Sequence, residues 1–240
     1  MRRFALASLR LLHVHPLPAV PAQPAIPPSA GAGAALPRFP WGPMLARWGW
    51  RLLQLPEDRF PPQVYQLPDA VFQSGWLGAP GATGAQLLAA EQRLGRPLPP
   101  SSRAFLQLTN GWPVGLTQPL VPSEEVELFQ VKEPEYARIW LEVWPGEDGE
   151  EFDLSAADHR VYGTQQKPSF FHHAYLQTAL QISEQEDGYV YLLNPEVVTP
   201  EGEGEAWILG SKILGAQRWP SFWELVQEES GTQLPGGSPG

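Results

Sequence analysis

The segment from Glu91 to Trp112 constrains the fold of this chain more than any other part of the sequence. It reads EQRLGRPLPPSSRAFLQLTNGW, and almost every residue in it has a structural role. Gly95 predicts the end of one helix, because glycine enters the left-handed conformation at the least cost. Pro100 suits the first turn of a second helix, and Asn110-Gly111 predicts its end in the same left-handed manner. The segment therefore predicts two short helices joined by a tight, proline-rich connection.

Local signals place the start and the buried face of these helices. Thr83 and Gln86 stand in the S/T-x-x-E/Q relation of a capping box, which satisfies two free N–H groups at the start of a helix. Leu87 and Leu94 follow at helical spacing, so we expect them on the buried side of the first helix. In the second helix, the residues that we expect to be buried are Ala104, Phe105 and Leu108.

The same segment resembles the signature of the SUKH superfamily, the Smi-one/Knr-four type of domain. That signature is roughly E-x-x-L-G-x-x-L-P-x-S-aromatic-x-x-F-L-x-x-x-N-G. The residues that fill it here are Glu91, Leu94, Gly95, Leu98, Pro99, Ser101, Phe105, Leu106, Asn110 and Gly111. Ser102 departs from it, because an aromatic residue is usual at that position. Further segments extend the resemblance over about residues 41 to 229, in the order in which the family has them. They are Trp76-Leu77-Gly78, Ile182 to Pro195, Glu205-Ala206-Trp207 and Trp219 to Leu225.

The remaining pattern indicates both strands and helices. We expect helices at Met44–Leu55, Phe170–Leu180 and Ser221–Glu229, and strands at Glu124–Val131, Arg138–Trp144, Tyr189–Leu193 and Ala206–Leu209. Asp187-Gly188 is typical of a hairpin turn, and the EGEGE run at 201–205 reads as a loop. This order predicts an α+β fold in a single domain, with a mainly antiparallel sheet packed with helices, as in SUKH domains.

The two ends of the chain differ in composition from the folded part. Residues 16–37 consist mainly of Pro and Ala, with almost no charge and no hydrophobic periodicity, so they cannot offset the entropy of becoming ordered. We therefore expect residues 1–40 to be a disordered leader, 41–229 to be the folded domain and 230–240 to be a disordered Gly/Pro tail. The basic start and the apolar run after it raise the question of a signal peptide, but Arg10 interrupts the run and no clear small-x-small cleavage site follows.

Charge is distributed unevenly along the chain. Residues 1–78 carry seven basic and three acidic side chains (+4), whereas residues 79–240 carry nine basic and twenty-three acidic ones (−14). A domain this acidic repels nucleic acid and anionic membranes, because proteins bind both of these through basic patches. It attracts basic proteins, although solubility alone would also explain the charge. The absence of cysteine excludes disulfides and thiolate chemistry and is compatible with a cytoplasmic location, which we expect.

Candidate catalytic motifs are each incomplete. His172 and His173 are adjacent, so on a helix they would point about 100° apart and could not chelate one metal ion. Asp158-His159 lacks the G-x-S-x-G serine of a hydrolase triad, and the EGEGE run lacks the Lys-Ser/Thr of a phosphate loop. Carboxylate pairs such as Glu142 with Asp153 arise in any chain this acidic. We therefore expect no catalytic residue, no metal and no cofactor.

The resemblance implies a non-enzymatic protein that binds another protein. In that superfamily, most bacterial members are regarded as immunity proteins that neutralise a polymorphic toxin of the same cell, and fungal members as scaffolds in cell-wall and signalling control. We expect an immunity protein whose partner is a basic toxin domain such as a nuclease. A regulatory or scaffold protein without a toxin partner is the alternative, and an enzyme is a third. The sequence identifies neither the toxin nor the oligomeric state.

A binding surface is predicted around the acidic run that follows Pro145-Gly146. Trp140 and Trp144 lie four residues apart on the expected strand, so their side chains should share a face beside this run. Tryptophan often supplies the buried anchor of an interface, although the same pattern is equally consistent with two core residues. The predicted partner-binding residues are Trp140, Trp144, Glu147, Asp148, Glu150, Glu151 and Asp153.

Overall fold

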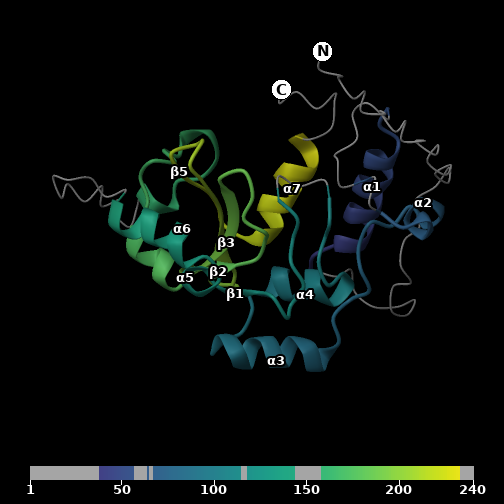
Figure 1. The fold of residues 1–240 in the computed structure, drawn as a ribbon, viewed down its shortest axis with the longest axis horizontal. Helices are drawn as coiled ribbons and strands as arrows, with labels where there is room; N and C mark the ends of the chain where they lie inside the picture. Colours follow the sequence, from purple (N-terminus) through teal and green to yellow (C-terminus); the bar gives the residue numbers. More distant parts are fainter. Residues whose placement is uncertain (1–37, 57–63, 65–66, 115–117, 144–157, 233–240) are drawn as a thin grey trace, which may run out of the picture.

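The computed structural model describes residues 38–56, 64, 67–114, 118–143 and 158–232. These residues form an α+β domain in which helices cover both faces of an antiparallel sheet (Figure 1), so the predicted fold class is confirmed. No helix within these ranges is long and apolar enough to cross a membrane.

The sheet is a meander, in which strands that are consecutive in the chain are also neighbours in space. Its described strands are β1 (Glu127–Leu128), β2 (Leu180–Gln181), β3 (Tyr189–Val198), β4 (Gly204–Gly210) and β5 (Gly215–Trp219), in the order β1-β2-β3-β4-β5. Each neighbouring pair is antiparallel. Asp187 and Gly188 have φ angles of 53° and 82°, and the bridge between Glu186 and Tyr189 closes the predicted hairpin turn around them.

The two central strands are buried on both faces. In β3, Tyr191 and Leu193 face a larger hydrophobic core, whereas Val190 and Leu192 face a smaller one. β4 alternates in the same way, with Ile208 in the larger core and Trp207 in the smaller. Successive side chains of a strand point to opposite faces, so two-sided burial requires the continuous apolar runs that these strands have.

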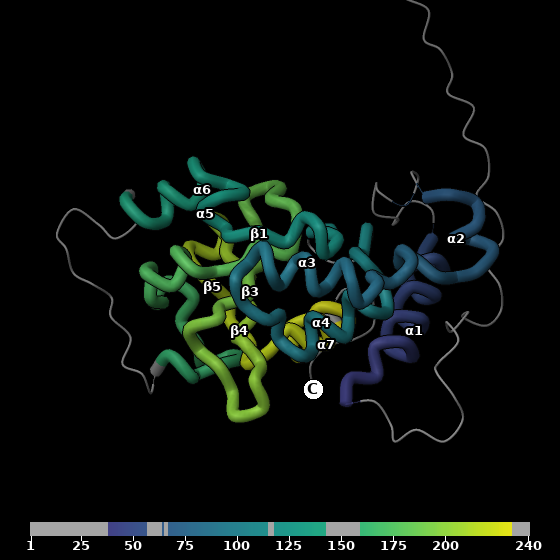
Figure 2. Tube along the Cα trace, turned by 90° about the horizontal axis from the view of Figure 1, so that it is seen from below, coloured from purple at the N-terminus to yellow at the C-terminus, as the bar shows by residue number. Residues whose placement is uncertain are grey.

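Different helices supply the two cores. The larger core is built with α1 (Trp41–Leu53), α2 (Asp69–Ser74), α3 (Gly84–Leu94), α4 (Pro100–Leu108) and α7 (Phe222–Thr232). The smaller core is built with α5 (Phe129–Lys132), α6 (Pro134–Arg138), the π-helical turn η3 (Ile139–Val143) and the 3-10 helix η6 (His173–Gln177). Two further 3-10 turns are η4 (Asp158–Arg160) and η5 (Gly163–Gln165). Figures 1 and 2 show α5 and α6 at the end of the molecule opposite α1.

The signature segment folds largely as its local signals predict. The capping box at the start of α3 is complete, with 3.2 Å from the N–H of Gln86 to Thr83 Oγ1 and 2.8 Å from the N–H of Thr83 to Gln86 Oε1. Gly95 ends this helix with φ 67°, and α4 begins at Pro100. The buried face of α4 differs slightly from the prediction, because Leu106 is buried with Phe105, whereas Ala104 and Leu108 are only partly buried.

The end of α4 also differs from the prediction. The helix ends at Leu108, and Thr109 is extended, so no left-handed residue terminates it directly. Gly111 nevertheless has a positive φ of 109°, and a Cβ there would lie 3.1 Å from the carbonyl oxygen of Leu120. Asn110 accepts a hydrogen bond from the N–H of Ser123 through its Oδ1, which fixes the next connection. Asn110-Gly111 therefore shapes the turn after the helix rather than its last residue.

Three predicted elements are wrong because tertiary packing overrides a short local pattern. Only Glu127–Leu128 of the predicted strand 124–131 pairs in the sheet, and Phe129 then starts a helix that buries its ring in the smaller core. Residues 138–143 are helical rather than a strand. The predicted helix 170–180 is instead a short 3-10 helix followed by β2.

The boundaries near the central hairpin are wrong as well. β3 continues through Asn194-Pro195 to Val198, with an irregular register after Asn194. β4 already begins at Gly204, so the last part of the predicted 201–205 loop lies in the sheet. The first and last helices are close to expectation, with shifts of one to three residues at their ends.

Candidate functional site

The structure places Trp140 in the smaller hydrophobic core rather than at the surface. Its side chain is 1% exposed and lies near the rings of Tyr136 and Phe171, at centroid distances of 6.2 and 6.1 Å. The physical reason is the helical backbone of 134–143, which turns Trp140 inward and leaves Glu142 exposed. The prediction that Trp140 lies on a strand is therefore wrong.

The other predicted interface residues, Trp144, Glu147, Asp148, Glu150, Glu151 and Asp153, lie outside the described residues. Their role in binding a partner stays a prediction. The described chain stops at Val143, directly before this segment, and resumes at Asp158.

A buried cluster of polar groups surrounds Glu205 of β4, inside the run that the sequence indicated as a loop. Four side chains lie within hydrogen-bonding distance of the Glu205 carboxylate. The distances to it are 3.1 Å from His159 Nε2, 2.9 Å from the Tyr162 hydroxyl, 3.0 Å from Asn194 Nδ2 and 2.9 Å from Trp207 Nε1. The Arg218 guanidinium lies 3.8 Å from the same carboxylate and donates to the carbonyl oxygen of His159. Glu205 and Arg218 are each 1% exposed.

The electrostatics of this cluster favour an ionised Glu205. Burial alone raises the pKa of its carboxyl group, but the hydrogen bond and charge of His159, with the Trp207 and Asn194 donors, outweigh that effect and leave the pKa below its ordinary value. Burial and then the charge of Glu205 raise the pKa of Tyr162. The carboxylate is thus held by surrounding donors and is shielded from solvent. Such an arrangement can position β4, the segment 158–162 and β5 relative to one another.

This cluster is not evident from the sequence, because its members are far apart in the chain. Asp158-His159 suggested a triad, but His159 pairs with Glu205, 46 residues away. The available signal was the position of Glu205 directly before an apolar run, two residues before Trp207 on the same face of a strand.

Glu203 has a second structural role, at the start of α4. Its carboxylate accepts hydrogen bonds from the N–H of Ser101 at 3.0 Å and from the Ser101 hydroxyl at 2.6 Å. A carboxylate at a helix N-terminus is favourable, because free N–H groups point toward it. Burial raises the pKa of Glu203, and these two hydrogen bonds partly oppose that effect. The contact connects the signature segment to the central hairpin.

The two adjacent histidines have separate environments. The His172 ring lies 5.0 Å from that of His159, and the His173 ring lies 4.2 Å from that of Phe171. Burial, followed by the neighbouring His172, lowers the pKa of His173. In the part of the chain that the structure describes, no group of three or more His, Cys, Asp or Glu side chains is placed to hold a metal ion.

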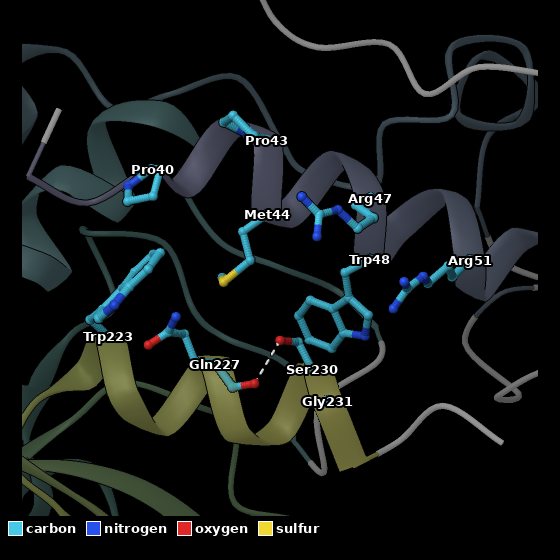
Figure 3. A pocket seen from close by; sticks show the side chains of 10 residues that line it. All are labelled: Pro40, Pro43, Met44, Arg47, Trp48, Arg51, Trp223, Gln227, Ser230 and Gly231. Atoms are coloured by element: carbon cyan, nitrogen blue, oxygen red, sulfur yellow. Dashed lines mark hydrogen bonds between the residues drawn. The ribbon is translucent and has the colours of Figure 1, made fainter. Parts of the chain in front are cut away.

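A pocket of about 340 Å³ lies between α1 and α7 (Figure 3). Met44 and Trp48 of α1 and Trp223 of α7 give it an apolar floor, and Arg47 and Arg51 extend from α1 beside it. Gln227, Ser230 and Gly231 line the α7 side. These residues form no recognisable motif in the sequence, although the i, i+4 spacing of Arg47 and Arg51 places both on one helix face.

A second depression, of about 400 Å³, lies beside the proline-rich connection of the signature segment. Leu98, Leu193 and Val198 give it an apolar lining, and Val198 is exposed on β3. Among the described residues that line it, Arg96 is the one charged residue, so no cluster of ionisable groups there indicates chemistry.

The model of the SMI1 / KNR4 family (SUKH-1) matches residues 81–228, which include the signature segment, the sheet and most of α7. A comparison with curated proteins finds no match.

Proposed function

This chain belongs to the SMI1 / KNR4 family (SUKH-1), and we propose that it acts by binding another protein rather than by catalysis. Specifically, it is an immunity protein that neutralises a bacterial polymorphic toxin by direct contact in the cytoplasm. The observation that carries this proposal is the family match over residues 81–228, which covers more than half of the chain. A scaffold protein of the same fold would also bind a protein, but it would protect no cell from a toxin.

The buried ionisable groups support binding over catalysis. Catalytic acids and bases must reach a substrate, whereas Glu205 is enclosed by donors from four other side chains and is shielded from solvent. Glu203 likewise directs its carboxylate at the backbone of Ser101. These two acids therefore stabilise the domain, and the surface remains the place where a partner is recognised.

An acidic surface leads into the predicted interface loop. Glu135 and Glu142 are exposed on α6 and η3, immediately before residue 144. The Tyr136 hydroxyl donates to the carbonyl oxygen of Gly188 at 2.7 Å, which holds α6 against the turn that carries Glu186 and Asp187. Arg138 and Lys212 neutralise part of this charge through ion pairs. The sequence adds five carboxylates at residues 147–153, and together these charges attract a basic toxin.

The first experiment tests neutralisation. A toxin domain encoded beside the gene for this protein is expressed in bacterial cells, with and without this protein. We expect growth to be restored only when both are expressed, and the two proteins to co-purify as a complex. A complex that forms without any effect on growth would favour the scaffold alternative, and turnover of a substrate by this protein alone would favour an enzyme.

A second experiment tests the acidic interface with purified proteins. The test variant combines Asp148→Asn, Glu150→Gln and Glu151→Gln. Its association rate with the toxin should be several-fold lower at low salt, because exposed carboxylates act mainly on the on-rate. The difference should nearly vanish near 0.5 M salt, where the Debye length is only about 4 Å. Stopped-flow fluorescence measures both rates.

The matched control changes the same number of charges elsewhere. Asp69→Asn, Glu196→Gln and Glu201→Gln alter exposed residues on α2 and the β3–β4 hairpin. This control should associate at nearly the parent rate. Equal rates for the parent and the loop variant at low salt would place the interface on another face, without affecting the growth result.

A further inference from the structure

Arg47 and Arg51 form a basic site on an acidic protein. Both are exposed on one face of α1, and neither has an ion pair or a hydrogen bond within the described residues. Arg93, Arg103, Arg138 and Arg218, by contrast, each pair with a glutamate. Arg51 lies in the last turn of α1, where a cation also interacts favourably with the helix dipole. Arg47 lies a turn earlier, so the dipole does not explain its position.

The floor between these arginines contains a buried donor without an acceptor. Trp48 is 2% exposed, and its Nε1 has no hydrogen-bond partner among the residues that the structure describes. Its ring stacks on Trp112 at 5.6 Å, with an interplanar angle of 15°, which fixes its orientation. A buried N–H without an acceptor costs free energy, which an acceptor brought by a ligand would recover.

The remaining walls suit an apolar side chain with polar flanks. Met44 and Trp223 face each other across the pocket (Figure 3), and Gln227 and Ser230 offer neutral polar groups from α7. No acidic residue lines the pocket among the described residues. Its volume of about 340 Å³ falls at the lower end of the usual range for ligand sites.

We propose that this pocket binds an acidic peptide segment of a protein partner, in which an apolar side chain is flanked by carboxylates. The apolar side chain packs on Met44, Trp48 and Trp223, and the carboxylates pair with Arg47 and Arg51. The site is opposite in charge to the acidic face of the proposed toxin interface. It therefore serves a different binding event, and it stands whether or not the partner of that face is a toxin.

Charge argues against the most obvious occupant within the chain itself. Residues 1–37 carry Arg2, Arg3 and Arg10 and no acidic side chain, so Arg47 and Arg51 repel this segment. A nucleotide or a free phosphate fits less well than a peptide. Phosphates are usually bound by free N–H groups at a helix N-terminus, whereas the pocket extends along the sides of α1, from Pro40 to Arg51, and of α7, from Trp223 to Gly231.

A nuclear magnetic resonance titration of the full chain tests the proposal. The probe is an acetylated and amidated heptapeptide, Glu-Asp-Glu-Phe-Leu-Asp-Glu, and its uncharged counterpart is Gln-Asn-Gln-Phe-Leu-Asn-Gln. We expect the acidic peptide to shift the indole N–H signals of Trp48 and Trp223, with a Kd below about 1 mM at low salt. Substitution of each tryptophan by phenylalanine assigns its signal.

Arg47→Gln and Arg51→Gln together should weaken binding of the acidic peptide about tenfold or more, because two charge-assisted contacts are lost. Both side chains are exposed and unpaired, so the melting temperature should remain that of the parent. The matched control, Arg138→Gln with Arg160→Gln, removes two exposed charges that do not line the pocket. This control should retain the parent affinity.

Three results would overturn the proposal. One is the absence of any shift of the two indole signals at about 5 mM acidic peptide. Another is equal binding of the charged and uncharged peptides. The third is tighter binding of adenosine monophosphate or inorganic phosphate than of the peptide, which would indicate a small phosphate ligand. Toxin neutralisation by the parent protein is measured separately, so failure here leaves the proposed function intact.

Discussion

At the scale of single residues, the domain depends on acidic side chains whose roles are hidden in the composition. Glu203 and Glu205 lie two residues apart, yet one accepts hydrogen bonds at the start of α4 and the other fills the centre of a buried polar cluster. The high acidity of the chain therefore does not all serve solubility or partner recognition. Some of it replaces apolar packing with charge-assisted hydrogen bonds between distant segments.

Glu205→Gln should destabilise the domain strongly at neutral pH. The substitution leaves the Arg218 guanidinium in the core without its counter-charge and turns an amide N–H₂ toward existing donors. Breaking a buried ion pair by changing one partner typically costs about 3 to 5 kcal/mol. Urea denaturation at pH 7 measures the loss. Glu201→Gln, on the exposed turn between β3 and β4, is the control and should lie within about 0.5 kcal/mol of the parent.

The loss should depend on pH in a defined direction. The pKa of Glu205 lies below its ordinary value, so its ionised form contributes stability that is fully present above the unfolded-state pKa of about 4.3. That contribution is lost as pH falls through the lower, folded-state pKa. The gap between the parent and Glu205→Gln should therefore be widest above about pH 5 and should narrow in more acidic solution. A gap that stays constant down to the acid transition would contradict this account of Glu205.

At the scale of elements, prediction from sequence succeeded where the signal is local. The capping box of α3, Gly95 and Pro100 each determine the backbone within one turn of themselves, so α3 begins and ends, and α4 begins, as expected. Residues 138–143 carry no such signal. Their pattern fits a strand, but Trp140 reaches the smaller core only through a helical turn, and that core is assembled from residues far away in the chain. The same reasoning explains why residues 173–177 and the Glu205 cluster were missed.

Phe105→Ala should be among the most damaging substitutions in α4. Phe105 is 2% exposed, and its ring lies 5.2 Å from that of Trp41 and 5.3 Å from that of Phe222. It therefore connects α4 with α1 and α7, and its removal leaves a cavity that these helices cannot fill. The expected loss is about 3 to 5 kcal/mol in the free energy of unfolding, measured in urea.

Leu88→Ala on α3 is the matched control for this prediction. Leu88 is 54% exposed, so the change should cost less than about 1 kcal/mol. Similar losses for the two variants would mean that the larger core does not depend on the contact between α4, α1 and α7.

At the scale of the whole molecule, the two cores are built by different helices, and the acidic surface and the basic pocket lie on different elements. The cores share the sheet, and each has its own set of helices. The acidic surface extends from α6 and the turn before β3, whereas the basic pocket lies between α1 and α7 at the other end. A domain arranged in this way can contact two partners of opposite charge without competition between them.

Removal of residues 1–37 should leave the folded domain intact. Every residue of the two described cores lies at or after Phe39, and the composition of the removed segment cannot build a core of its own. The truncated chain should melt within about 2 °C of the parent, because a change below about 0.5 kcal/mol shifts a domain of this size by no more than that. Differential scanning calorimetry measures the difference. A large drop in melting temperature would show that part of residues 1–37 packs on the domain. The α1–α7 pocket should also keep its affinity for the acidic peptide. Residues 1–37 are basic, so Arg47 and Arg51 repel them, and their removal should not change the occupancy of the pocket.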